Sequence, residues 1–229
     1  MDGDTSMGQQ SGRKKKIAVV DDHPIVRQGL AELIANQGDM EVCCQAEEAV
    51  SAVKAIAEAK PDLAIIDISL KDSDGIELIE DLASRMSRLP MLVLSMHDES
   101  FYAERVLRAG ARGYITKSEA PKAVITAIRR ILSGELYLSQ RMASRMLAKF
   151  VDGRSKATGR PEDRLTNREL QVFELYGKGV GTRDIAERLH LSIKTIESHR
   201  EHIKQKLQFS SARELLQHAI QWVLLRGAS

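Results

Sequence analysis

In the first half of this 229-residue chain, three acids, a hydroxyl and a lysine each end or interrupt a short apolar run. They are Asp21, Asp22, Asp67, Ser95 and Lys117. The run around Asp67, residues 63–70, has the length and composition of a strand that is buried on both faces. Because a buried carboxylate is costly unless it is paired or reaches solvent, we expect Asp67 at the carboxyl end of a central parallel strand.

These residue types together indicate a chemistry. Carboxylates that share a crevice repel one another, and their pKa values rise unless a cation is present. Mg²⁺ prefers oxygen ligands, so Asp21, Asp22 and Asp67 predict a magnesium site. With the metal bound, Asp67 could attack a phosphoryl group and form an aspartyl phosphate. Lys117 and the metal would neutralise the transferred group, and Ser95 could then donate a hydrogen bond to it.

The elements that must bring these residues together are alternating strands and helices. We expect strands at residues 16–22, 41–45, 63–70, 91–96 and 113–116, and helices at 24–37, 47–60, 76–82, 101–109 and 120–132. Strict alternation predicts an α/β fold with a five-stranded, parallel, doubly wound sheet. The carboxyl ends of parallel strands lie at one edge of the sheet, so the polar side chains should converge there. Tyr114, three residues before Lys117, should rotate with the adjoining loop.

Each residue also has a simpler interpretation. Asp21 and Asp22 could merely mark the start of a helix, and Lys117 could be an ordinary surface lysine. His23 is expected to be structural, because a site built from hard oxygen ligands does not need an imidazole. His97 is expected to be a solvated loop residue near the site. The joint occurrence at strand ends favours the phosphoacceptor site.

The second half of the chain has the opposite charge. Residues 15–133 contain 15 Lys and Arg against 19 Asp and Glu, a net charge of −4, although the whole chain has +2. Residues 164–229 contain 11 basic against 7 acidic residues, a net charge of +4. An acidic half followed by a basic half suggests two domains, of which the second acts near a polyanion.

The basic half is expected to be an all-α domain of four helices. Helix-start signals are Thr166 with Glu169, Thr182, Ser192, and Ser211 with Glu214. A tight turn at His190 before the third helix predicts a helix-turn-helix. That helix, residues 192–207, should bury Ile193, Ile196, Ile203 and Leu207. A solvated helix would show much the same charge pattern, so the pattern alone leaves both interpretations open.

The remaining segments mark the domain boundaries and indicate the cellular compartment. We expect a disordered tail at residues 1–15, a phosphoacceptor domain at 16–133, a helix and flexible linker at 134–163, and the basic domain at 164–229. The tail has no apolar core, so we do not expect it to be a secretory signal. Cys43 and Cys44 are adjacent, and a bridge between them would be strained, so we expect small buried thiols in a reducing compartment. We therefore expect a cytoplasmic protein.

Five motifs give the first half a family resemblance: VVDDHP, IIDISL, DSDGIEL, VLSMHDE and GYITKS. Over residues 16–132 the chain resembles the receiver domain of two-component response regulators. The resemblance implies a flavodoxin-like fold, Mg²⁺ dependence and phosphorylation of Asp67 by a sensor histidine kinase. It also implies that the backbone carbonyl of Ser69 is a metal ligand. Two positions depart from the usual pattern. Lys71 stands where a proline is common and Met96 where a small residue is common, and we expect bulky Met96 to slow the loss of phosphate.

The second half resembles the LuxR-type DNA-binding domain in LTNRELQVFEL and GVGTRDIAERLHLSIKTIESHREHIKQKL, so the whole resembles the NarL/FixJ class of response regulators. The resemblance implies that the helix at 192–207 enters the DNA major groove and that a homodimer binds two half-sites. Contacts with DNA phosphates are implied for Lys194, Thr195, His199, Arg200, Lys204 and Lys206, and positions near base edges for Glu197, Ser198 and Glu201.

Two other classes of function remain open. The receiver fold could be a docking or dimerisation scaffold that ignores phosphate while the second half binds DNA. An aspartyl phosphatase would need a second catalytic acid near Asp67, but the residue two positions later is Ser69. We therefore expect a transcription regulator and no conventional enzyme.

Overall fold

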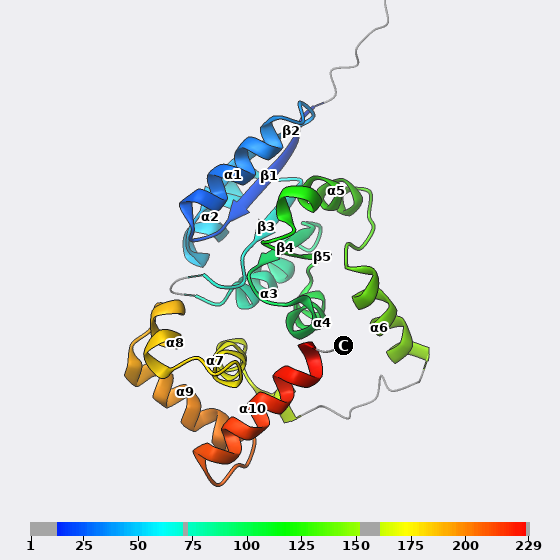
Figure 1. Ribbon diagram of the computed structural model, residues 1–229. Coiled ribbons are helices and arrows are strands. Elements are labelled where there is room, and N and C mark those ends of the chain that lie inside the picture. The colour runs from blue at the N-terminus through cyan, green and yellow to red at the C-terminus, as the bar shows by residue number, and fades with distance from the viewer. Residues whose placement is uncertain (1–12, 71–72, 152–160, 228–229) are drawn as a thin grey trace, which may run out of the picture.

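The computed structural model describes residues 13–70, 73–151 and 161–227 (Figure 1). In its first half, strands and helices alternate as predicted. The strands are β1 (Lys15–Val20), β2 (Met40–Ala46), β3 (Leu63–Ile66), β4 (Met91–Ser95) and β5 (Gly113–Thr116). The helices are α1 (Pro24–Ala35), α2 (Ala49–Ala59), α3 (Gly75–Arg85), α4 (Glu99–Ala109) and α5 (Ala120–Leu132).

The five strands form one parallel sheet in the order β2-β1-β3-β4-β5, which confirms the predicted fold class. β3 is the central strand, and all of its side chains are buried. It ends at Ile66, so Asp67 follows it directly instead of lying within it. The backbone N–H of Asp67 still donates to the carbonyl of Val20, at 2.8 Å, which holds Asp67 beside the end of β1.

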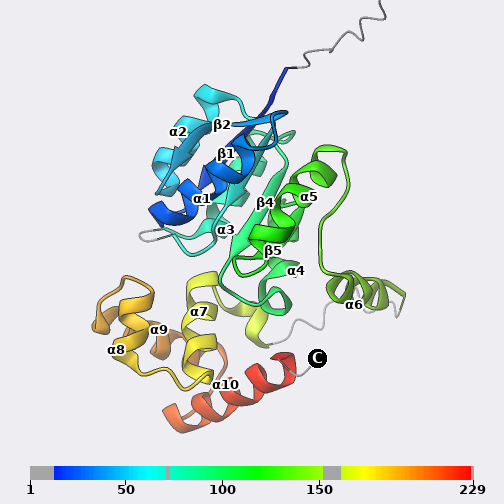
Figure 2. The same cartoon turned by 45° about the horizontal axis from the view of Figure 1, so that its top comes forward.

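Both faces of the sheet are covered, because side chains of a strand alternate between the faces. Ile65 of β3 packs with residues of α1 and α5 such as Leu30 and Val124. Ile66 packs on the other face with residues of α2, α3 and α4 such as Ile56. Figure 2 shows α1 and α5 together in front of the sheet. The sheet is therefore enclosed between two layers of helices, and the residues that follow the strands at their carboxyl ends lie at one edge of it.

Cys43 and Cys44 lie on the edge strand β2, where the pairing register shifts between Val42 and Cys44. Both thiols are free, as expected, but they are only partly buried. The expectation of small buried residues was therefore wrong, because an edge strand does not have neighbours on both sides.

After the sheet domain, the chain first pairs with the edge of β5 and then forms α6 (Gln140–Val151). Tyr137 makes an isolated parallel bridge to Gly113, and its carbonyl accepts from the N–H of Tyr114 at 2.9 Å. Most of the predicted flexible linker, residues 152–160, and most of the predicted N-terminal tail, residues 1–12, lie outside the described residues.

The second half contains a short turn of 3-10 helix, η1 (Pro161–Arg164), and the predicted four helices. These are α7 (Asn167–Gly177), α8 (Thr182–Arg188), α9 (Ile193–Lys206) and α10 (Ala212–Gly227). The predicted capping box of Thr166 and Glu169 is confirmed, and Ser192 caps α9. The cap of α8 is Gly181, so the expectation for Thr182 was wrong.

The third helix of this domain, α9, also differs from its predicted burial at one end. Ile196, Ile203 and Leu207 are buried as expected, whereas Ile193 is 43% exposed. Ile193 is the first helical residue, and no earlier turn of the helix lies above it. The buried stripe therefore begins one turn later than predicted.

The two halves contact each other through α4 on one side and α7, α10 and η1 on the other (Figures 1 and 2). Phe101 of α4 stacks on Trp222 of α10, with ring centroids 4.6 Å apart. Arg105 of α4 donates to the carbonyls of Leu165 and Glu162, at 2.9 and 2.8 Å. Within the described ranges, none of the helices has both the length and the apolarity needed to cross a bilayer.

Candidate functional site

The structure brings the predicted polar side chains together at the carboxyl edge of the sheet. Asp21 and Asp67 are each 1% exposed, and Ser95 is fully buried. The ammonium of Lys117 lies between the two acids, 2.7 Å from Oδ2 of Asp67 and 2.7 Å from Oδ2 of Asp21. The lysine therefore balances two buried carboxylates that would otherwise be costly.

The charges in this pocket shift the titration of its members. Burial raises the pKa of Asp67, Lys117 opposes that rise, and the negative charge of Asp21 adds to it. Burial alone would lower the pKa of Lys117, but Asp67 and Asp21 raise it above its ordinary value. Lys117 is therefore held in its charged form, facing the side chain that is expected to react.

The residues present fit a hard divalent cation. Ligand atoms of Asp21, Asp22, His23 and Asp67 all lie within 4.8 Å of one another. Three of the four are carboxylates, the ligand type that Mg²⁺ prefers. Nδ1 of His23 lies 2.6 Å from Asp22 and 3.2 Å from Asp21, and the imidazole is largely exposed. The carboxylates would hold the ion, and His23 would lie at the rim.

Two backbone features keep Asp67 in place. The N–H of Ser69 donates to Oδ1 of Asp67 at 3.0 Å, which fixes the carboxylate and leaves Oδ2 to Lys117. Gly75, the first residue of α3, approaches so closely that a Cβ would lie 2.2 Å from the carbonyl oxygen of Asp67. Glycine at position 75 is thus required by packing, and the side chain of Asp74 accepts from the N–H of Ile76 and caps α3.

The two predicted switch residues meet at the backbone of His97. Oγ of Ser95 accepts from the N–H of His97 at 3.1 Å, and the Tyr114 hydroxyl donates to the His97 carbonyl at 2.9 Å. Tyr114 is buried, and burial raises the pKa of its hydroxyl. Met96, which is expected to slow the loss of phosphate, is 75% exposed.

His97 itself was predicted wrongly as a solvated loop residue, because its side chain is only 11% exposed. Nε2 lies 3.0 Å from Oγ of Ser69, and Nδ1 lies 2.9 Å from Oε2 of Glu174 on α7. We did not single out Glu174 from the sequence. A signal was present, since Glu174 follows Leu170 by four residues and shares the buried face of its helix.

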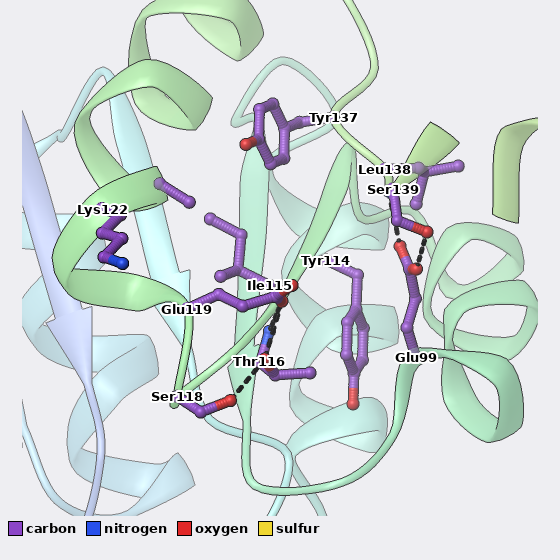
Figure 3. A pocket seen from close by; sticks show the side chains of 11 residues that line it. Glu99, Tyr114, Ile115, Thr116, Ser118, Glu119, Lys122, Tyr137, Leu138 and Ser139 are labelled. Atoms are coloured by element: carbon purple, nitrogen blue, oxygen red, sulfur yellow. Dashed lines mark hydrogen bonds between the residues drawn. The ribbon is translucent and has the colours of Figure 1, made fainter. Parts of the chain in front are cut away.

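A pocket of about 370 Å³ lies beside this switch region, between β5, α5 and the chain that follows α5. Figure 3 shows Tyr114 and Tyr137 on its walls, with Glu99 reaching Ser139. The N–H of Ser139 donates to Glu99 at 2.9 Å, and this ties the start of α4 to the chain that leads into α6.

The outer face of α9 is accessible. Lys194, Glu197, Ser198 and Glu201 are exposed, and Thr195, His199, Arg200, Lys204 and Lys206 are partly exposed. The burial that remains lowers the pKa of His199. Figures 1 and 2 show α9 on the far side of α7 from the sheet. The predicted DNA-contacting residues therefore share a helix whose outer face is not covered by the first domain.

Several of these residues already have partners within their own domain. The guanidinium of Arg200 donates to Thr182 and to the Tyr176 hydroxyl, at 3.1 and 2.7 Å, and lies 4.2 Å over the Tyr176 ring. Lys206 lies 2.7 Å from Glu169, which joins the end of α9 to the cap of α7. Within the described part of the chain, Lys194 forms no such hydrogen bond or ion pair, and its side chain is exposed.

Comparison with known proteins assigns each half of the chain to a protein family. Residues 17–129 match the response regulator receiver domain family, and residues 163–219 match the luxR family of bacterial regulatory proteins. The oxygen regulatory protein NreC of Staphylococcus aureus (strain MRSA252) is 35% identical over 214 residues, which cover 92% of this chain and 99% of NreC.

Solved structures agree with this assignment. A two-component response regulator of the LuxR family from Aurantimonas sp. SI85-9A1 is 33% identical, with a TM-score of 0.56 over 60% of this chain and 99% of that one. RcsB of Salmonella enterica serovar Typhimurium, bound to the promoter rprA in the presence of phosphomimetic BeF3-, is 26% identical, with a TM-score of 0.57 over 90% and 98% of the two chains. The chain therefore belongs to the LuxR family of two-component response regulators, which are transcription regulators that bind DNA under the control of phosphorylation.

Proposed function

We propose that Asp67 is the phosphoacceptor of this regulator and that Asp21, Asp22, Asp67 and the carbonyl of Ser69 hold Mg²⁺ beside it. The observation that carries the proposal is the ammonium of Lys117 at 2.7 Å from both Asp67 and Asp21. A lysine between two buried acids, of which Asp67 follows the central strand β3 and Asp21 follows β1, matches the needs of a nucleophile that becomes phosphorylated.

Each side chain then has a separate task. Oδ2 of Asp67 attacks the phosphoryl group while the Ser69 N–H holds Oδ1, and the bond from phosphorus to the donor's leaving group breaks as the new P–O bond forms. A metal held by the carboxylates of Asp21, Asp22 and Asp67 would supply positive charge that favours the transfer. Lys117 supplies further charge, and the Ser95 hydroxyl donates a hydrogen bond to the transferred group. Tyr114 follows the movement of Ser95, because both contact the backbone of His97.

We propose a sensor histidine kinase as the phosphoryl donor and double-stranded DNA as the target, bound by a homodimer in the cytoplasm. RcsB, a relative with a solved DNA complex, supports the DNA and dimer parts of this proposal, since one structure contains two RcsB dimers on two DNAs. The transfer to Asp67 and its later loss are reactions of the protein on itself, so we assign no enzymatic activity toward a separate substrate.

The DNA-binding surface in this proposal is the outer face of α9. Lys194, Thr195, His199, Arg200, Lys204 and Lys206 would contact phosphates, and Glu197, Ser198 and Glu201 would lie near base edges. The net charge of +4 on residues 164–229 supports binding to a polyanion. Glutamates near base edges can accept from cytosine amino groups or repel misplaced phosphates, and therefore act as filters.

The experiment uses duplexes selected from a random library by the full-length protein after treatment with acetyl phosphate and Mg²⁺. We expect the wild type to bind these duplexes more tightly, and to become a larger species in light scattering, after the same treatment. Asp67→Asn should show neither change. A wild type with equal affinity and size in both states would favour the phosphate-independent scaffold.

A further inference from the structure

His97 makes contacts in four directions around the phosphoacceptor site. Its N–H donates to Ser95, its carbonyl accepts from Tyr114, and its imidazole contacts Ser69 and Glu174. Ser69 lies on the loop after β3, and His97 on the loop after β4. The contact between Ser69 and His97 therefore joins the two loops that follow the strands carrying Asp67 and Ser95.

Glu174, from the other domain, is fully buried against this imidazole. Its Oε2 lies 2.9 Å from Nδ1 of His97 and accepts from the Tyr102 hydroxyl at 3.0 Å, while Oε1 accepts from Lys178 at 2.5 Å. Burial raises the pKa of Glu174, but His97 and Lys178 lower it below its ordinary value. The Glu174 carboxylate, which has three partners, holds the His97 ring in place. If the ring rotated away, buried polar groups would be left unpaired, which is costly.

We propose that Glu174 is a positioning residue of the phosphoacceptor site. Through His97 it holds the bridge to Ser69 closed while the two domains are docked, and it thereby slows the passage of the phosphoryl donor and of water to Asp67. This inference rests on the proposed function of Asp67. It assigns to the DNA-binding domain a direct part in the chemistry of the receiver.

A closed bridge between His97 and Ser69 should slow both the gain and the loss of phosphate on Asp67. When Glu174 is removed, the His97 ring loses its anchor, and both the gain of phosphate from a small donor and its later loss should accelerate. The steady level of phosphorylation should change less than either rate. A merely destabilised fold would instead lower the level and would not speed the gain.

The test follows the intact mass of the full-length protein over time, first with acetyl phosphate and Mg²⁺ and then after removal of the donor. We expect Glu174→Ala to speed both phases about fivefold or more, the lower end of typical coupling factors between sites. His97→Ala, on the receiver side, should do the same even where Glu174→Ala folds poorly. In the double variant, the second substitution should add nothing, because both remove one link.

Tyr102→Phe is the matched control, since it removes a hydrogen bond to the same Glu174 oxygen but leaves the His97 contact. We expect both of its rates to stay near those of the wild type. Three results would overturn the role of Glu174 but leave the proposed function of Asp67 standing. They are unchanged rates in Glu174→Ala, equal acceleration by Tyr102→Phe, and full additivity in the double variant. A wild type that gains no mass would overturn the proposed function as well.

Discussion

At the scale of single residues, the account depends on a carboxylate that is buried for reaction and not for stability. Asp67 is 1% exposed, and the charge of Asp21 lies beside it. Lys117 offsets part of this cost, and a divalent cation would offset more. The folded protein without metal therefore carries an unfavourable charge at the site of its chemistry.

The free energy of unfolding should show this cost. The pKa of Asp67 is raised in the folded state, so its contribution to stability is full below the unfolded value, near 3.8, and is lost as the pH rises through the folded value. At neutral pH without Mg²⁺, Asp67→Asn should raise the free energy of unfolding, because it removes the buried charge. Added Mg²⁺ should then stabilise the wild type more than the variant.

Urea denaturation with chelator and with Mg²⁺ measures both effects. Asp21→Asn is a useful companion, since it removes the neighbouring charge and should also stabilise the protein without metal. An Asp67→Asn protein that is less stable than the wild type in chelator would contradict the electrostatic account.

At the scale of helices and strands, the sequence predicted nearly everything that periodicity and capping determine. The order of elements, the central place of the Asp67 strand and the convergence of Ser95 and Lys117 with it are confirmed. The strands predicted at residues 16–22, 63–70 and 91–96 end earlier, at Val20, Ile66 and Ser95, whereas the strand at 113–116 has its predicted bounds and β2 is one residue longer at each end. Thr182 was mistaken for a cap because Gly181 can end the loop equally well and gives no side-chain signal.

One helix contact gives a sharp test of packing in the DNA-binding domain. A Cβ on Gly177 of α7 would lie 2.4 Å from the carbonyl oxygen of Ala219 on α10. We expect Gly177→Ala to destabilise this domain by about 1–3 kcal/mol, because backbone atoms cannot move aside easily. Thermal unfolding followed by circular dichroism measures the change.

The matched control is Gly29→Ala in α1, where a Cβ would meet nothing within 4 Å. That variant should be stabilised by about 0.5–1 kcal/mol, since alanine favours a helix more than glycine does. Equal destabilisation by both substitutions would show that α7 and α10 do not pack as closely as described.

The outer face of α9 allows a second test at this scale. Lys194→Ala should weaken binding to all duplex sequences and reduce the slope of log affinity against log salt by about 1, as the loss of one phosphate contact requires. Lys54→Ala on α2 removes the same charge from an exposed position in the receiver and should leave the slope unchanged. A change of sequence preference in Lys194→Ala, at constant slope, would count against a phosphate contact.

At the scale of the whole molecule, the contact between the domains was beyond sequence analysis. His97 and Glu174 are 77 residues apart, and each has an adequate local interpretation, one as a loop histidine and the other as a helix glutamate. Only the docking of α4 on α7 and α10 buries both. Predicting it would require the relative placement of two domains, which periodicity and capping do not determine.

The docked arrangement should open when its polar contacts are removed. Arg105 donates to Leu165, Asn167 and Glu162 across the interface, at 2.8–3.1 Å. Arg105→Gln should increase both the radius of gyration and the maximum dimension in small-angle X-ray scattering. Arg108→Gln, one turn further along α4 and paired with Glu104 within it, should leave both measurements unchanged.

The central claim is that this regulator is switched by phosphorylation of Asp67. Intact-mass spectrometry of the full chain after incubation with acetyl phosphate tests it most directly. The account predicts one added phosphoryl group in the wild type with Mg²⁺, none with chelator, and none in Asp67→Asn under either condition. A wild type without the added mass, or an Asp67→Asn variant that gains it equally, would contradict the account.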